Sequence, residues 1–170
     1  TQEGDRPKSL SEIIIWDQEG QPIDPTKTTL LWSSFEDPGF PNSISIPRLV
    51  EKDADALKER YLAWVYDLGE MVVDGKRLVD HLQIRRGFSY WWMAHIVEKC
   101  NFSKSRQIDD VIKLMVFDTW AGSHPIERLR FFSANEALAK TLKVWCIRVG
   151  VGFKWKNDKL PKSKVQWRRC

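Results

Sequence analysis

The sequence feature that most constrains the fold is a strand, helix and strand pattern in residues 126–155. The run IERLRFFS has the apolar and aromatic composition of a short strand. The helix predicted after it carries Leu138 and Leu142 on one face, and Gly150 is placed to cap its C-terminus before VGFKW resumes as a strand. A helix of this length between two strands predicts a right-handed crossover that joins parallel neighbours.

Two earlier apolar runs extend this pattern to the N-terminal part of the chain. Residues 13–16 and 30–32 are continuously apolar rather than alternating, which is typical of parallel strands covered on both faces. A long helix is predicted from Pro47, and a second one ends before Gly122. We therefore predict an α/β fold, a Rossmann-like three-layer α/β/α sandwich with a mainly parallel sheet.

Length and charge suggest how the chain is divided. Its 170 residues, of which 42% are hydrophobic, suit a single domain, which we assign to residues 1–156. The net charge of +4 is concentrated near the C-terminus, where residues 154–170 hold seven Lys/Arg against one Asp. Residues 157–170 are therefore read as a basic tail or the start of an interdomain linker. Such a tail can contact an anionic membrane, or it can be a solvated chain end.

Several functional classes lack their sequence signatures. The chain has no dinucleotide-binding, P-loop, zincin or nucleophile-elbow motif, and its three cysteines are far apart and odd in number. We expect reduced thiols, no metal site and no cofactor held by this chain. The sequence has no apolar run long enough to span a membrane and no signal-peptide core, so a cytoplasmic location is expected, with peripheral contact at the inner membrane through the tail.

The carboxyl ends of the predicted strands carry polar side chains. In open α/β sheets ligands bind at this edge, beside helix N-termini. The rule selects Asp17, Ser33, Ser34, Ser133 and Asn135. Ser133 has an alternative role, because Ser133 and Glu136 have the spacing of a capping box and could simply begin the helix. Ser33 and Ser34 could equally be polar strand ends.

The stretch GFSYWWMAHIVEKCNFSKS, residues 87–105, is the second candidate region. We predict a helix over 88–99 with Ser89 as its N-cap, and with Trp92, Met93, Ile96, Val97 and His95 in the core. Glu98 would end this helix against the preference of its dipole, which could raise the pKa of Glu98 and make it a general base. Glu98 could equally be exposed or paired.

Charged residues flank this predicted helix at both ends. Arg85 and Arg86 precede it and are suited to hold an anion, although they could also be two solvated loop charges. Lys99 follows Glu98 and suits the C-terminal end of a helix. Nucleic-acid binding through the tail ranks last among the hypotheses, because the tail is short and the rest of the chain is slightly acidic.

Residues 70–156 resemble a known family. The runs DGKRLVDHLQIRRGFSYWWMAHIVEKCNFSKS, IDDVIKLMVFDTW, IERLRFFS, NEALAKTLKVWC and GVGFKWK look like the N-terminal region of bacterial surface-carbohydrate biosynthesis proteins, which are glycosyltransferase-like and related to Kdo transferases. The most specific element is matched by Gly75, Leu78, Ser89, Trp91, Trp92, Glu98 and Lys99.

The resemblance implies one half of a GT-B-like enzyme of surface polysaccharide biosynthesis. Such enzymes have two Rossmann-like domains, the first for the acceptor and the second for an activated sugar donor, and this chain has room only for the first. The resemblance thus implies a carbohydrate acceptor and a C-terminal donor-binding domain as partners, and catalysis that this chain does not complete alone. Glu98 would be the base, and Arg85, Arg86, Ser89, Trp91, Lys99, Ser133 and Asn135 would bind substrate. The alternative is a non-catalytic α/β module that binds a small anion or a protein partner.

Overall fold

The computed structural model describes most of the 170-residue chain. The described residues are 10–20, 22, 24–36, 40–98 and 105–157. The chain divides into two compact units, unit 1 with residues 1–45 and 121–170, and unit 2 with residues 46–120. Each unit is described by itself below. None of the helices in the described ranges combines the length and apolar character needed to cross a bilayer.

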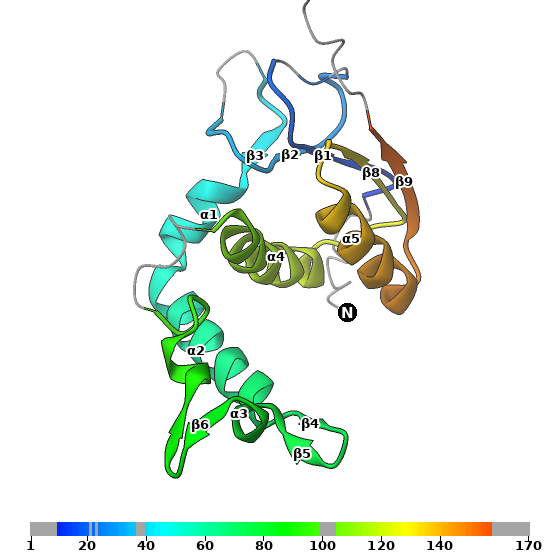
Figure 1. The fold of residues 1–170 in the computed structure, drawn as a ribbon. Helices are drawn as coiled ribbons and strands as arrows, with labels where there is room; N and C mark the ends of the chain where they lie inside the picture. The colour runs from blue at the N-terminus through cyan, green and yellow to red at the C-terminus, as the bar shows by residue number, and fades with distance from the viewer. Residues whose placement is uncertain (1–9, 21, 23, 37–39, 99–104, 158–170) are drawn as a thin grey trace, which may run out of the picture. The chain divides into compact units, whose positions relative to one another are not determined.

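Unit 1 contains a five-stranded sheet in which every pairing is parallel (Figure 1). Its strands are β1 (Ile13–Trp16), β2 (Thr29–Leu31), β3 (Ser43–Ser45), β8 (Arg128–Phe132) and β9 (Gly152–Lys156). They lie in the order β3-β2-β1-β8-β9. The predicted Rossmann-like α/β fold is confirmed. Strand β3 was not predicted, because its sequence SIS lacks the apolar run on which the other assignments depended.

The centre of this sheet is the core of unit 1. Ile15 pairs in register with Leu30 on one side and Phe131 on the other, and all three side chains are fully buried. Trp16 and Phe132 pair one position further on, with ring centroids 5.3 Å apart. Burial of successive residues along β1 explains why this strand is apolar throughout instead of alternating.

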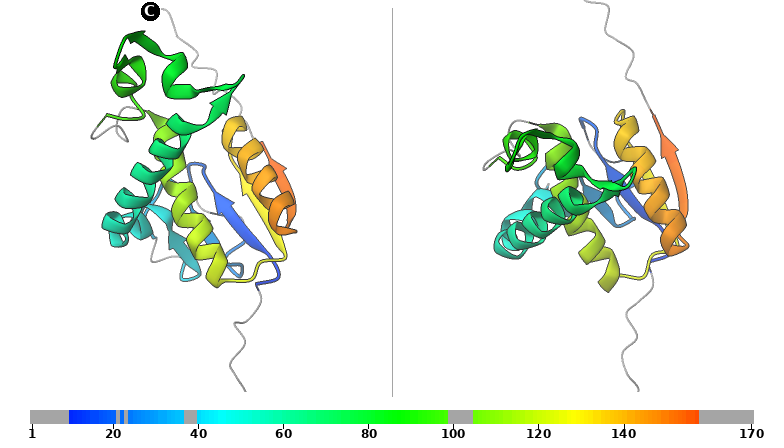
Figure 2. Two further views of the ribbon diagram at one scale, coloured as in Figure 1. Left: turned by 90° about the horizontal axis from the view of Figure 1, so that it is seen from below. Right: turned by 60° about the horizontal axis from the view of Figure 1, so that its bottom comes forward.

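The predicted crossover is present as β8, α5 (Glu136–Val149) and β9, with α5 running alongside these two strands (Figure 2). Gly150 caps the helix with φ 75°, and its N–H donates to the Cys146 carbonyl. The predicted capping box is wrong. The N-cap is Asn135, whose side chain accepts from Leu138 N at 3.1 Å, while Ser133 lies two residues before it.

Unit 2 is built on three helices, α1 (Ile46–Lys52), α2 (Ala54–Glu70) and α4 (Arg106–Ser123), of which the last three residues of α4 belong to unit 1. Leu57 of α2 packs with Met115 and Val116 of α4. Arg60 adds a polar link, donating to the Met115 carbonyl at 2.9 Å and to Asp118 at 2.8 Å. The helix predicted from Pro47 is therefore two helices, separated at Asp53.

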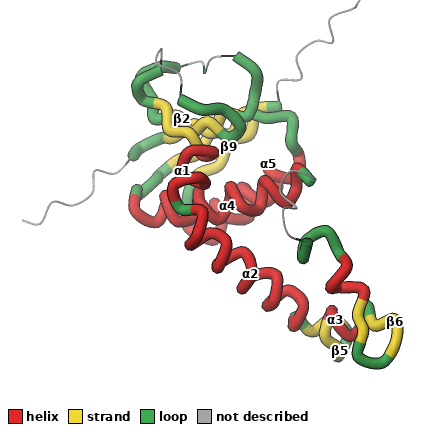
Figure 3. The backbone as a smooth tube through the Cα atoms, turned by 90° about the vertical axis from the view of Figure 1, so that its left-hand side faces the viewer, coloured by secondary structure: helices red, strands yellow, loops and turns green. Residues whose placement is uncertain are grey.

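Two small hairpins follow α2 and lie at one end of it (Figure 3). The elements are β4 (Val72–Val73), β5 (Lys76–Arg77), α3 (Leu78–His81), β6 (Gln83–Arg85), β7 (Phe88–Ser89) and the 3₁₀ helix η1 (Tyr90–Met93). The predicted turn at Asp74 and Gly75 joins β4 to β5, with φ 48° and 77° at these residues. Both values are typical of the tight turn that Asp-Gly favours.

The helix predicted over 88–99 is wrong. Within the described residues 88–98 only Tyr90–Met93 is helical, as one 3₁₀ turn that begins after Ser89. Trp91 is buried against Gly69 of α2, while Trp92 and Met93 are 56% and 63% exposed. The prediction assumed 3.6 residues per turn over twelve residues, whereas the apolar residues are divided by one short turn and a bend at Ala94.

Candidate functional site

The most developed polar site lies where the strand order of the sheet reverses. From β1 the chain continues to β2 and β3 on one side, and β8 and β9 lie on the other, so β1 and β8 flank the topological switch point. Asp17 directly follows β1 and Ser133 directly follows β8. The carboxyl edge at such a point is where open α/β sheets bind ligands.

The predicted edge residues are joined around one carboxylate. Ser133 Oγ donates to Asp17 Oδ2 at 2.7 Å, and Ser33 Oγ donates to Asp17 Oδ1 at 2.9 Å. The backbone N–H of Asn135 donates to Ser133 Oγ at 2.9 Å. We call Asp17, Ser33, Ser133 and Asn135 the Asp17 cluster. Ser34, the fifth residue selected from the sequence, is exposed beside Ser33.

Burial assigns different roles to the two serines. Ser133 is fully buried, and the Trp155 indole N–H donates to its carbonyl at 2.9 Å, so this serine holds Asp17 in place. Asp17 is half-buried and Ser33 is exposed, so a ligand can reach these two side chains. The sequence predicted which residues meet here, but it missed Trp155, whose side chain fixes the Ser133 backbone.

Backbone amides at the N-terminus of α5 donate hydrogen bonds to side chains of the cluster. Two amide groups at this end have acceptors in the cluster, since Asn135 Oδ1 accepts from Leu138 N and Ser133 Oγ accepts from Asn135 N. With the Asp17 carboxylate held beside Ser133, this edge favours ligands that donate hydrogen bonds over ligands that carry negative charge.

The predicted base Glu98 lies in unit 2, in a turn rather than at the end of an α-helix. Glu98 Oε2 contacts His95 Nδ1 at 3.1 Å, and the two side chains are 43% and 77% exposed. The prediction of His95 as a core residue is wrong. The dipole argument for Glu98 also loses its basis, because residues 94–98 form turns and bends and no α-helix ends there.

The remaining predicted residues of unit 2 divide into exposed and structural ones. Arg85 and Arg86 are exposed on the second hairpin, and the Arg85 guanidinium lies 5.3 Å from the Phe88 ring centroid. Ser89 is buried, donates to the Val79 carbonyl at 2.5 Å and accepts from Trp91 N at 3.2 Å, which confirms it as a cap. Lys99 lies outside the described residues.

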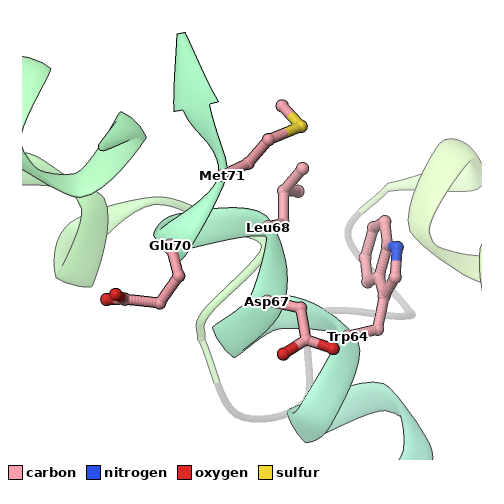
Figure 4. Close-up of a pocket in the computed structure, with 5 residues that line it drawn as sticks. All are labelled: Trp64, Asp67, Leu68, Glu70 and Met71. Atoms are coloured by element: carbon pink, nitrogen blue, oxygen red, sulfur yellow. The ribbon is translucent and has the colours of Figure 1, made fainter. Parts of the chain in front are cut away.

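An open depression that was not predicted lies on the last two turns of α2 (Figure 4). Its volume is about 370 Å³, and it is lined by Trp64, Asp67, Leu68, Glu70 and Met71. Two of the lining residues, Asp67 and Glu70, carry carboxylates. The Glu70 carboxylate accepts from Arg77 at 3.1 Å and so already has a cationic partner. The spacing of these residues is that of one face of a helix. A sequence pattern cannot tell whether such a face is exposed or packed against another element.

The described ranges hold no group of three or more His, Cys, Asp or Glu side chains arranged to bind a metal ion. Comparison of the chain with family models, curated proteins and solved structures gives no match. What the resemblance implied is therefore supported only for the fold, as one Rossmann-like parallel sheet.

Proposed function

We propose that this chain is the acceptor-side domain of a glycosyltransferase of bacterial surface polysaccharide biosynthesis, and that the Asp17 cluster binds hydroxyl groups of a sugar. The observation that carries the proposal is the Asp17 carboxylate, held by Ser33 and Ser133 at the switch point of a parallel sheet. A ligand at this edge meets an accessible carboxylate and an exposed hydroxyl.

The chemistry of the cluster suits a sugar. A carboxylate accepts hydrogen bonds from hydroxyl groups, and such charge-assisted bonds are stronger than neutral ones. Ser33 occupies Asp17 Oδ1 with a hydroxyl, so a sugar hydroxyl can make the same bond beside it or in its place. Ser133 acts as a positioning residue, because its buried bond to Asp17 Oδ2 fixes the direction in which the carboxylate points.

The alternative is a non-catalytic module that binds a small anion or a protein. An anion is disfavoured beside Asp17, since it would be repelled by the Asp17 carboxylate, which Ser33 and Ser133 hold at this edge. The Asp17 cluster therefore supports a neutral or hydroxyl-rich ligand better than phosphate or sulfate.

Within this proposal Glu98 remains the candidate base. Its carboxylate lies beside the His95 imidazole and is accessible, as a group that takes a proton from an acceptor hydroxyl must be. The activated sugar donor would bind to a C-terminal donor-binding domain, so transfer requires that second half. Basic residues of unit 2 and the tail would hold acidic sugars or the membrane surface.

Saturation-transfer NMR with methyl galactoside and methyl N-acetylglucosaminide tests the site. We expect saturation of the ring protons with the wild-type chain, and at least about tenfold weaker binding with Asp17→Asn, because an amide replaces the charged acceptor without changing its shape. Ser33→Ala, at an exposed position, should weaken binding by a smaller factor. Ser133→Ala should weaken it and also lower the free energy of unfolding, by about 1–3 kcal/mol.

Asp24→Asn is the matched control, because Asp24 is another aspartate of unit 1 and its carboxylate accepts from Thr26. This variant should bind like the wild type. Equal binding by wild type and Asp17→Asn would remove the cluster from sugar recognition. Binding of inorganic phosphate that Asp17→Asn strengthens, without any glycoside signal, would favour the anion-binding module instead.

A further inference from the structure

Unit 2 exposes an unusual concentration of apolar side chains on and beside its two hairpins. Seven large apolar residues within positions 71–93 have exposed fractions between 39% and 64%. They are Met71, Val72, Val73, Ile84, Tyr90, Trp92 and Met93. Together with the exposed cations Lys76, Arg85 and Arg86, we call these residues the hairpin surface. Large apolar side chains that gather at the surface in this way are a feature of interaction sites.

The hairpin surface is held by specific contacts between its elements. His81 Nε2 of α3 lies 2.7 Å from the Val73 carbonyl of β4, and Ser89 of β7 donates to the Val79 carbonyl of α3. Trp91 packs on Gly69 at the end of α2, with its indole nitrogen 3.0 Å from where a Cβ would stand. These contacts hold the elements together, while large parts of the seven apolar side chains stay exposed.

The charge of the segment is positive. Residues 71–93 hold four Lys/Arg against two Asp. Arg77 and Asp80 are paired with each other at 2.7 Å, and hydrogen bonding to Arg77 holds the pKa of the Asp80 carboxyl below its usual value. This leaves three cations, Lys76, Arg85 and Arg86, against Asp74 on the two hairpins.

The arrangement favours a bilayer surface over a flat protein partner. Val72 and Val73 are consecutive strand residues and point to opposite faces, yet both are exposed, and all three residues of β6 are exposed. A flat partner would cover one face of each hairpin, whereas the headgroup region of a bilayer surrounds both. Tyr, Trp and Arg are also the residues that anchor proteins at this depth, with apolar parts in the acyl boundary and polar ends in water.

We propose that the hairpin surface inserts into the headgroup region of an anionic bilayer and attaches the chain peripherally to the membrane. Apolar side chains would enter the acyl boundary by about 5–10 Å. Lys76, Arg85 and Arg86 would pair with lipid phosphates. The proposal does not depend on sugar binding by the Asp17 cluster, and it differs from attachment through the basic residues 157–170.

Co-sedimentation with vesicles of phosphatidylcholine containing about a third phosphatidylglycerol tests the proposal. The wild-type chain should pellet with these vesicles and much less with phosphatidylcholine alone. The double variants Ile84→Ser/Trp92→Ser and Arg85→Glu/Arg86→Glu should each lower the partition coefficient by at least about tenfold. These side chains are exposed, so circular dichroism and the Tm should stay at the wild-type values.

Two variants serve as controls. Ile147→Ser alters an apolar residue of α5 that is 71% exposed but lies in unit 1, and it should bind like the wild type. Arg168→Glu/Arg169→Glu removes charge from the tail and should leave most of the binding. Wild-type binding by both hairpin variants would overturn the proposal, as would loss of binding in the tail variant alone. The proposal would also be overturned if the wild type does not bind vesicles but forms a concentration-dependent dimer that Ile84→Ser/Trp92→Ser abolishes. That outcome would favour self-association.

Discussion

The strands of unit 1 and the hairpin strands of unit 2 are made of similar residues but have opposite environments. Ile13, Ile14 and Ile15 of β1 are at most 2% exposed, whereas Val72 and Ile84 in the hairpins are 64% and 63% exposed. The β1 residues are paired on both edges of the strand, by β2 and β8, while each hairpin strand has one partner. Apolar β-branched residues thus form a core in one unit and a surface in the other.

This difference separates apolar residues that stabilise the sheet from apolar residues that stay exposed. In unit 1 the apolar residues stabilise the sheet, and the polar groups at its carboxyl edge form the candidate ligand site. In unit 2 buried contacts such as Trp91 on Gly69 stabilise the hairpins, and the apolar residues of the hairpin surface stay accessible to a partner. The comparison can be tested by substitutions that should affect only one of the two environments.

The largest effect is expected for Phe131→Ala, which empties a fully buried position of β8. The free energy of unfolding should fall by about 3–5 kcal/mol, because a large cavity is left in the centre of the sheet. Ile84→Ala, at an exposed hairpin position, should change it by less than about 0.5 kcal/mol. Urea denaturation followed by circular dichroism measures both, and equal losses would show that the hairpins are as buried as the sheet.

A smaller effect is expected for Gly69→Ala. A Cβ at Gly69 would lie 3.0 Å from Trp91 Nε1 and 3.2 Å from Trp91 Cε2, so the indole must shift, and the free energy of unfolding should fall by about 1–3 kcal/mol. Gly122→Ala is the matched control, because this helical glycine of α4 has open space around it. It should stabilise the chain by about 0.5–1 kcal/mol. A stabilising Gly69→Ala would contradict the packing of Trp91 on α2.

The smallest effect is a pH dependence at Cys146, on the buried side of α5. Burial raises the pKa of the Cys146 thiol to about 11, from an ordinary value near 9.0. The contribution of the protonated thiol to the free energy of unfolding is fully present below the pKa of the unfolded chain, near 9.0. It is lost as the pH rises through the pKa of the folded chain, about 11. The free energy of unfolding should fall more steeply between these values for the wild type than for Cys146→Ala. Parallel profiles would contradict the shift.

How well the sequence predicted each region depends on how local its determinants are. The segment of β8, α5 and β9 was predicted to within about two residues at the element ends, because its helix period and the Gly150 cap lie within the segment itself. Residues 88–99 were misassigned because the contact that orients them is made by Trp91 with Gly69, which is 22 positions earlier. The spacing of apolar residues within 88–99 carries no information on a contact with Gly69.

The Asp17 cluster shows the same limit at a finer scale. Four of the five residues that the strand-end rule selected are joined in the cluster, and Ser34 is exposed beside Ser33. The four meet because the carboxyl ends of parallel strands lie at one edge. The prediction that Ser133 caps the helix was wrong, since the cap is Asn135 and both residue types can cap. The Ser133 hydroxyl instead donates a hydrogen bond to Asp17, which is 116 positions away in the sequence.

That bond also has a consequence for how the chain folds. Ser133 and Asp17 can meet only after β1 and β8 have paired across most of the chain, a contact of high sequence separation that forms slowly. A chain in which β1 and β8 are not yet paired therefore lacks the Asp17 cluster, and a ligand that binds the cluster would select the paired sheet. By mass action, a ligand of Asp17 should slow the loss of β1, β8 and β9 together, so protection of their amides from hydrogen exchange would report occupancy of the site.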